Sequence, residues 1–291
     1  MKKIVILGVE NSHADSFLDF IFNDKVFSGI EVVGVYSDED EAIKRITSKF
    51  DVPVMKNFDE AVGKVDGVII TARHGDNHYK YAKPYIKSGV PMFIDKPITI
   101  SKKEGIRFMT ELKNNNVKIS GGSLLKHDSF VKSLKEKHEN AVGGETLSAF
   151  IRAPLMINSP YGGFYFYAQH LVEISSEIFG KYPLSVQAVD KDGDINLTID
   201  YGDFLVFGSY VNSTSEYFVL RNSKEGVESA SVFNNEAKEC SKREFKEYYD
   251  ILFGGESKVN YKDFIAPVFF MNAIYKSLKK GKKVKVEKIK L

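Results

Sequence analysis

The 291-residue sequence contains a single cysteine and no tryptophan, and what it lacks already excludes several classes of protein. Cys240 has no second cysteine with which to form an intramolecular disulfide, so we expect a reducing, cytoplasmic environment. No apolar run is long enough to span a bilayer, and Glu10 interrupts the N-terminal apolar run before it could act as a signal sequence. The net charge of +2 provides no general attraction to nucleic acid or to a membrane.

The composition is that of an ordinary globular protein. Apolar residues make up 43% and charged residues 27% of the chain, and the length favours two domains over one. The C-terminal stretch after Tyr275 is rich in lysine, but no aromatic residue interleaves those lysines. We therefore interpret it as a solvated helix end and edge strand, and expect neither nucleic acid nor a membrane as a partner.

The first 120 residues alternate between short apolar runs and helical patterns. The apolar runs lie at 3–8, 30–36, 66–72, 90–97 and 117–120. They lack polar alternation and their connections are short, which is typical of a parallel sheet covered by helices on both faces. We predict a Rossmann-type dinucleotide-binding domain over 1–121, with its ligand at the carboxyl ends of the strands.

The pattern changes after the Gly-Gly-Ser at 121–123. The segment "INLTIDY" at 195–201 alternates strictly, and three further strand patterns follow it at short intervals. Helical patterns precede and follow these strands, which predicts an α+β domain with a largely antiparallel sheet over 122–291. Apolar residues on the second face of this sheet need cover, so we expect a homodimer or homotetramer.

The turn after the first strand departs from the dinucleotide fingerprint G-x-G-x-x-G. In "IVILGVENSHADSF" that frame falls on Gly8, Glu10 and His13, so two of the three glycines are missing. A carboxylate about 4 Å from a phosphate costs roughly 4 kcal/mol at an effective dielectric of about 20. Glu10 must therefore point away, or no dinucleotide binds in the usual pose. Asn11, Ser12 and His13 still offer donors at a helix N-terminus, although they could simply cap that helix.

Two longer motifs carry a resemblance to a known family. One is "DGVIITARHGDNHYKYAKPYIKSGVPMFIDKP" at 66–97, and the other is "GGFYFYAQHLVEISSEIFG" at 162–180. Together they resemble the Gfo/Idh/MocA family of sugar, polyol and related oxidoreductases. The family's fourth strand ends in Glu-Lys-Pro, which corresponds to the residues at 95–97, and a histidine on the preceding helix matches His78. In the second motif the paired glycines and His170 match, but Phe166 stands where the family has an aspartate.

The resemblance implies a hydride transfer between a carbinol carbon and a nicotinamide. His170 has the side-chain type of the base that removes the carbinol proton, and Lys96 would stabilise developing charge on the substrate oxygen. Lys126 and Asp128 lie near positions where the family contacts substrate. Tyr167 belongs to an aromatic cluster that could stack on a sugar-like substrate or pack in the core. The cofactor is NAD or NADP, and NAD is favoured because Asp38 would repel a 2′-phosphate. The implied cofactor-binding residues are Gly8, Asn11, Ser12, His13, Ser37, Asp38, Thr71, Ala72, Arg73, His78 and Asp95.

Several alternatives stay open at this stage. Tyr167 or Glu173 could orient His170 in place of the missing aspartate, or His170 could be a structural residue. Asp128 could contact substrate or cap a helix. The spacings of the histidines match no familiar ligand pattern, so we expect no metal site.

The sequence therefore supports an oxidoreductase acting on a small hydroxy compound as the leading hypothesis. A second hypothesis is a non-redox binding or regulatory protein that keeps the scaffold and has lost the cofactor. A third is a protein that uses bound NAD for transient oxidation during elimination or glycoside cleavage.

Overall fold

The computed structural model describes residues 1–212 and 214–291, and these form two compact units. The first unit contains Met1–Gly122, Ser241–Phe264 and Leu291. The second contains Ser123–Cys240 and Ile265–Lys290. The predicted boundary after residue 121 divides the chain once, whereas residues 241–264, which belong to the second predicted domain, lie in the first unit. The assignment of functional domains stays a prediction.

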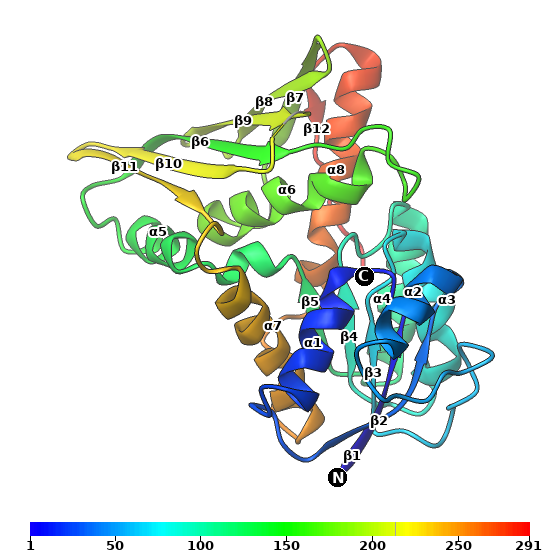
Figure 1. Ribbon diagram of the computed structural model, residues 1–291. Helices are drawn as coiled ribbons and strands as arrows, with labels where there is room; N and C mark the ends of the chain where they lie inside the picture. The colour runs from blue at the N-terminus through cyan, green and yellow to red at the C-terminus, as the bar shows by residue number, and fades with distance from the viewer. Residues whose placement is uncertain (213) are drawn as a thin grey trace. The chain divides into compact units, whose positions relative to one another are not determined.

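The first unit is built on a parallel sheet of five strands (Figure 1). The strands are β1 (Lys2–Leu7), β2 (Ile30–Tyr36), β3 (Gly67–Ile70), β4 (Met92–Asp95) and β5 (Ile119–Gly122). Their order is β2-β1-β3-β4-β5, and every neighbouring pair is parallel. This confirms the predicted Rossmann-type architecture, in which buried strands read as continuous apolar runs.

Helices supply the cover that such a sheet requires. They are α1 (Ser12–Phe22), α2 (Asp40–Thr47), α3 (Gly75–Ile86), α4 (Lys102–Asn114) and, from residue 241 onward, the later part of α7 (Ala237–Leu252). Helices α3 and α4 pack together through Tyr79 and Phe108, whose ring centroids are 5.2 Å apart.

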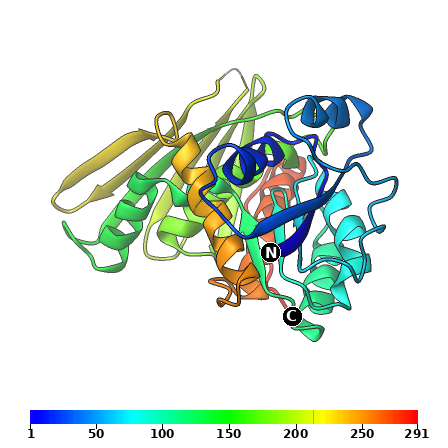
Figure 2. The ribbon, with the colours of Figure 1, turned by 60° about the horizontal axis from the view of Figure 1, so that its bottom comes forward.

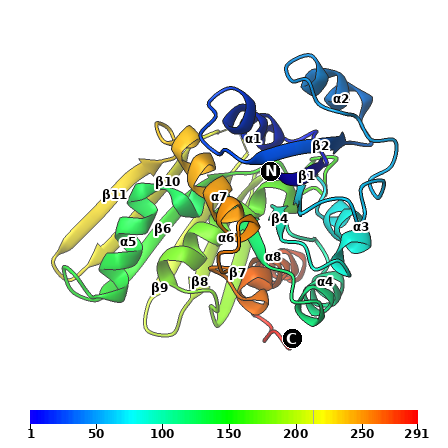
Figure 3. The ribbon, with the colours of Figure 1, turned by 90° about the horizontal axis from the view of Figure 1, so that it is seen from below.

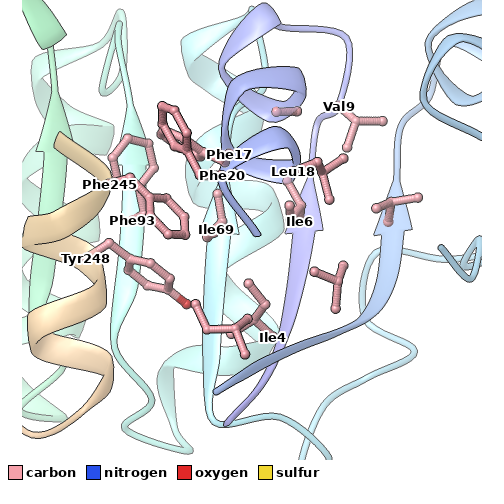
Figure 4. Packing of buried hydrophobic residues seen from close by; sticks show 14 of the residues in the cluster. Ile4, Ile6, Val9, Phe17, Leu18, Phe20, Ile69, Phe93, Phe245 and Tyr248 are labelled. Carbon is pink, nitrogen blue, oxygen red and sulfur yellow. The ribbon is translucent and has the colours of Figure 1, made fainter. Parts of the chain in front are cut away.

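The later part of α7, drawn in orange, runs beside α1, drawn in blue (Figure 2). The core between β1, β3, β4 and α1 includes side chains from this part of α7 (Figure 4). The ring of Phe17 on α1 lies 5.0 Å from that of Phe93 on β4 and 4.9 Å from that of Phe245 on α7. Tyr248 is also fully buried in this cluster. A segment distant in sequence therefore completes the apolar cover of the parallel sheet.

The second unit carries a mixed sheet of seven strands. The strands are β6 (Thr146–Pro154), β7 (Ser185–Lys191), β8 (Asp194–Asp200), β9 (Leu205–Val211), β10 (Tyr217–Ser223), β11 (Gly226–Val232) and β12 (Val284–Lys285). Their order is β11-β10-β6-β9-β8-β7-β12, and within the described residues of this sheet only β6 and β9 pair in parallel. The predicted largely antiparallel sheet is confirmed, although the sequence analysis missed β6 and β7.

The helices of the second unit gather on one face of this sheet (Figures 1 and 3). They are η1 (Leu124–His127), α5 (Ser129–Glu139), α6 (Tyr165–Phe179) and the part of α8 (Tyr261–Lys280) after residue 264. Tyr210 on β9 donates a hydrogen bond to the Ala168 carbonyl of α6 at 2.6 Å. Ser277 on α8 accepts one from the Ala188 main-chain nitrogen at 2.9 Å. Within the described chain, no helix combines the length and apolar character needed to cross a membrane.

Candidate active site

The turn after β1 is pressed against the segment that follows β3. Gly8 has a φ of +83°, and a Cβ on this residue would lie 2.4 Å from the main-chain nitrogen of Ala72. Thr71 donates a hydrogen bond from Oγ1 to the Gly8 carbonyl at 3.0 Å. Only glycine meets both demands without strain, so the first glycine of the fingerprint has a steric reason to be here. The structure thus brings three predicted cofactor-binding residues together.

Glu10 replaces the second glycine of the fingerprint, and its side chain spans the ends of two strands. The residue is buried, with 5% of its surface exposed. Its Oε2 accepts a hydrogen bond from Ser37 Oγ at 2.7 Å, and its Oε1 accepts one from the Arg73 main-chain nitrogen at 3.1 Å. Burial raises the pKa of the Glu10 carboxyl, and the bond from Ser37 opposes that shift.

Asp38, which follows Ser37 after β2, is held by other partners. It accepts hydrogen bonds from the Tyr36 hydroxyl, from the Tyr81 hydroxyl at 2.8 Å and from Lys80 at 3.3 Å. The bond from Tyr36 is the main cause that lowers the pKa of Asp38. The two predicted residues at the end of β2 therefore have different partners. Ser37 is hydrogen-bonded to Glu10, and Asp38 is hydrogen-bonded to two tyrosines.

The N-terminus of α1 contacts the end of β4 through buried polar side chains. Asp95 is fully buried and accepts hydrogen bonds from Asn11 Nδ2 at 2.6 Å and from the Lys96 main-chain nitrogen at 2.7 Å. His13 Nδ1 lies 3.0 Å from Asp95 Oδ1 and 3.9 Å from Glu244 Oε2 on α7. Asn11 also caps α1 by accepting from the His13 main-chain nitrogen.

These neighbours shift two pKa values in opposite directions. Burial alone would lower the pKa of His13, but the attraction of Asp95 and Glu244 outweighs it and the pKa is raised. Burial alone would raise the pKa of Asp95, but the charge and hydrogen bond of His13 outweigh it and the pKa is lowered. The geometry therefore favours the charged pair.

Lys96 and His78 lie beyond the carboxyl ends of β4 and β3. Lys96 is buried and precedes a cis peptide bond to Pro97. Burial lowers the pKa of Lys96, while the charges of Asp95 and Glu244 oppose the shift. His78 is fully buried, and its ring nitrogens lie 2.7 Å from the Ala72 carbonyl and 3.3 Å from that of Ile98. His78 thus fixes main chain at the edge where the cofactor was predicted.

In the second unit, His170 on α6 is oriented by a serine. Ser123 Oγ lies 2.7 Å from His170 Nδ1, and both side chains are buried. The rings of Tyr167 and Tyr217 lie 5.5 and 5.7 Å from the imidazole. Ser123, which the sequence analysis had treated only as part of a domain boundary, is therefore a further candidate for the group that orients His170 in place of the missing aspartate at Phe166.

Lys126 and Glu173 lie near each other in the same unit. Lys126 Nζ is 3.9 Å from Glu173 Oε2, and Gln169 donates a hydrogen bond to Glu173 Oε1. Glu173 therefore has partners of its own on α6 and η1. Lys126 and Tyr167, the two predicted substrate residues, are both partly buried.

Asp128 has a structural role. It caps α5 by accepting from the main-chain nitrogens of Phe130 and Val131, and its other oxygen accepts from Phe233. Asp128, Glu236 and Cys240 offer ligand atoms within 4.8 Å of one another. Because Glu236 in turn accepts two hydrogen bonds from Ser129, the two carboxylates already anchor the surrounding loop.

Comparison with known proteins supports the resemblance stated above. Residues 2–123 match the family model GFO_IDH_MocA, described as an oxidoreductase family with an NAD-binding Rossmann fold. No curated protein matches this chain closely enough to count as a relative.

Solved structures resemble the chain over nearly its whole length. Scyllo-inositol dehydrogenase from Lactobacillus casei is 14% identical, with a TM-score of 0.83 over 98% of both chains. Myo-inositol 2-dehydrogenase from Lactobacillus plantarum is 12% identical, with a TM-score of 0.83 over 98% of this chain and 99% of that chain. An oxidoreductase from Agrobacterium radiobacter, solved with NAD⁺, L-tartaric acid and magnesium, is 13% identical, with a TM-score of 0.76 over 98% of both chains. At these identities the likeness shows a shared fold.

Proposed function

We propose, from the match of residues 2–123 to the Gfo/Idh/MocA family model, that the protein is an NAD(P)-dependent oxidoreductase of that family. Its substrate in this proposal is a sugar, a polyol or a related hydroxy compound. The observation that carries the proposal is the carboxyl edge of the parallel sheet, where the Gly8 turn, the segment after β3 and Asp95 lie together. We propose residues 1–121 as the cofactor domain and 122–291 as the substrate and oligomerisation domain.

The chemistry of this edge fits a dinucleotide. The exposed Ser12 and the first main-chain nitrogens of α1 are donors for a diphosphate, and buried carboxylates are acceptors for ribose hydroxyls. When bound, the nicotinamide supplies the acceptor or donor of a hydride. We propose that the dinucleotide is held by Gly8, Asn11, Ser12, His13, Ser37, Asp38, Thr71, Ala72, Arg73, His78 and Asp95.

Lys96 and His170 are the proposed catalytic residues. Lys96 donates a hydrogen bond to the substrate oxygen, and its lowered pKa keeps the ammonium proton available for exchange. His170 takes up the hydroxyl proton at Nε2 in the tautomer whose Nδ1–H donates a hydrogen bond to Ser123 Oγ. Lys126 and Tyr167 are proposed to contact the remaining hydroxyl groups of the substrate.

The substrate class and the assembly complete the proposal. Two of the similar structures are inositol dehydrogenases, which act on cyclic polyols, and this favours a polyol for the present chain. We propose a cytoplasmic enzyme that works as a homodimer or homotetramer and recognises a small molecule.

Two measurements on the full chain test the proposal. NADH and NADPH are titrated separately while nicotinamide fluorescence and the melting temperature are followed. Oxidation of a panel of polyols and sugars is then measured for the wild type, Lys96→Ala and His170→Ala. We expect one dinucleotide to bind and both substitutions to abolish turnover while leaving dinucleotide binding in place. Failure of both dinucleotides to bind would overturn the proposal.

One observation favours the second hypothesis, a non-redox protein built on the same scaffold. Three buried carboxylates, Glu10, Asp95 and Glu244, belong to the unit that carries the fingerprint turn. Their negative charge disfavours a diphosphate. In that case neither dinucleotide shifts the melting temperature, whereas an uncharged sugar or polyol does.

A further inference from the structure

The turn after β1 places the carboxylate of Glu10 at the end of β2, where a fold that binds NAD usually carries an acidic side chain. In folds of this kind an acidic side chain at the end of the second strand binds the ribose hydroxyls of NAD. Ser37 stands at that position here and cannot supply the charge. Glu10, from the turn after β1, reaches the same place, because its Oε2 lies 2.7 Å from Ser37 Oγ.

Asp38 is the other acid at the end of β2, but its carboxylate already accepts three hydrogen bonds. One oxygen accepts from the Tyr36 hydroxyl, and the other accepts from Tyr81 and Lys80. Lys80 also compensates the negative charge of Asp38. With three bonds accepted, Asp38 has about one acceptor position left for a ribose, whereas Glu10 accepts two bonds at the carboxyl edge of the sheet.

Glu10 has unused capacity as an acceptor. A carboxylate has about four acceptor positions, and the bonds from Ser37 and the Arg73 main chain occupy two of them. Those two bonds fix the orientation of the carboxylate. The 2′- and 3′-hydroxyls of an unmodified ribose are donors that match the remaining positions, whereas a 2′-phosphate has only acceptors and carries the same sign of charge.

We infer that Glu10, rather than Asp38, is the acid that accepts hydrogen bonds from the adenosine ribose and disfavours dinucleotides with a 2′-phosphate. The inference deepens the proposed function and rests on it. It makes Glu10 a specificity-determining residue for NAD over NADP, and it assigns Ser37 and the Arg73 main chain to positioning that carboxylate.

The test is a comparison of two neutral, isosteric variants, Glu10→Gln and Asp38→Asn. Dissociation constants for NADH and NADPH are measured by nicotinamide fluorescence on the full chain. We expect the wild type to prefer NADH by about 100-fold, a like-charge penalty reduced from its close-contact value by solvent. Glu10→Gln narrows this ratio by about tenfold or more, mainly through tighter NADPH binding. Asp38→Asn, which removes a half-exposed charge paired with Lys80, narrows the ratio by less than Glu10→Gln does.

Several outcomes overturn the inference. Equal tightening of both dinucleotides in Glu10→Gln would mean that Glu10 only repels the diphosphate. A ratio that narrows in Asp38→Asn and not in Glu10→Gln would assign selection to Asp38. If the wild type binds NADH and NADPH equally, the inference is wrong but the proposed function stands. If neither the wild type nor a variant binds either dinucleotide, both the inference and the proposed function are wrong. Should Glu10→Gln not fold, Glu10→Asp, which keeps the charge, must keep the preference for NADH.

Discussion

His170 illustrates at the residue scale how one hydroxyl can take the place of a carboxylate. The position four residues before it, Phe166, cannot accept a hydrogen bond, and Ser123 engages Nδ1 from outside the helix. In Ser123→Ala the imidazole loses the partner that fixes its orientation, so we expect kcat to fall by about tenfold or more, within the contribution typical of a positioned acid–base group. Steady-state kinetics with the best polyol substrate measure this.

A merely structural role for Ser123 makes a different prediction. Loss of a buried hydrogen bond destabilises a protein by about 1–3 kcal/mol but leaves the pH profile of the surviving activity unchanged. If Ser123 positions the base, Ser123→Ala shifts the acid limb of the kcat profile and Ser123→Thr restores it. An unshifted profile would contradict the positioning role.

The pairing of His13 with Asp95 makes a pH-dependent contribution to stability. The raised pKa of His13 means that its contribution is complete below about pH 6.5 and is lost as the pH rises through the folded-state pKa. The lowered pKa of Asp95 means that its contribution is complete above about pH 4 and is lost at lower pH. The pair therefore stabilises the fold most between about pH 4 and 6.5.

We expect His13→Gln to lower the free energy of unfolding by about 2 kcal/mol at pH 5.5 and by less at pH 9. Urea denaturation at the two pH values measures the difference. Lys44→Gln, which removes an exposed ion pair with Glu41, is the control and leaves the pH dependence unchanged. An equal loss at both pH values would show that His13 contributes packing alone.

At the scale of helices and strands, α7 contributes to the core of the parallel sheet. Phe245 is fully buried between the rings of Phe17 and Phe27, whereas Phe253, just after the helix, is 44% exposed. We expect Phe245→Ala to lower the free energy of unfolding by about 3–5 kcal/mol. Phe253→Ala is the matched control and costs under about 1 kcal/mol. Equal losses for the two variants would contradict the assignment of residues 241–264 to the first unit.

Local apolar patterns were sufficient to predict β1 to β5, because β1 and β3 to β5 are largely buried on both faces and even the edge strand β2 is a continuous apolar run apart from Glu31. They were insufficient for β6 and β7. The buried face of β6 includes Ala149 and Ala153, small residues that mark no clear period, and β7 buries only Val186 and Ala188 after its first residue. Weak alternation of small residues does not distinguish a strand from a loop.

Some residues of the candidate site could likewise be predicted from local sequence, and others could not. Asp95 and Lys96 could be predicted because a contiguous motif follows a recognisable strand. The bonds from Ser123 to His170 and the approach of Glu244 to His13 could not, since each joins residues that no helical or strand spacing relates. Glu10 was singled out as an obstacle from its charge alone, and only its partners Ser37 and Arg73 reveal the direction of its side chain.

For the whole molecule, the open face of the second unit's sheet bears on assembly. Phe150 pairs across the strands with Phe207 on one side and Leu220 on the other, so three large apolar side chains lie in a row on three neighbouring strands. Phe207 is 43% and Leu205 38% exposed. A contiguous apolar patch of this kind is costly in water and marks an interaction surface. We propose a second copy of this chain as its cover.

Phe207→Lys places a charge at the exposed end of that row and should convert the assembly to monomers at micromolar concentration. Sedimentation velocity of the wild type and the variant measures the change, and far-UV circular dichroism checks that the variant folds. Val62→Lys is the matched control, because Val62 is similarly exposed but belongs to the first unit, and it should leave the sedimentation coefficient unchanged. The lysine acts at the interface because a buried, unpaired charge opposes association more strongly than an exposed one does. A wild type that sediments as a monomer, or a Phe207→Lys variant that remains oligomeric, would contradict the proposal that copies of the chain meet through this face.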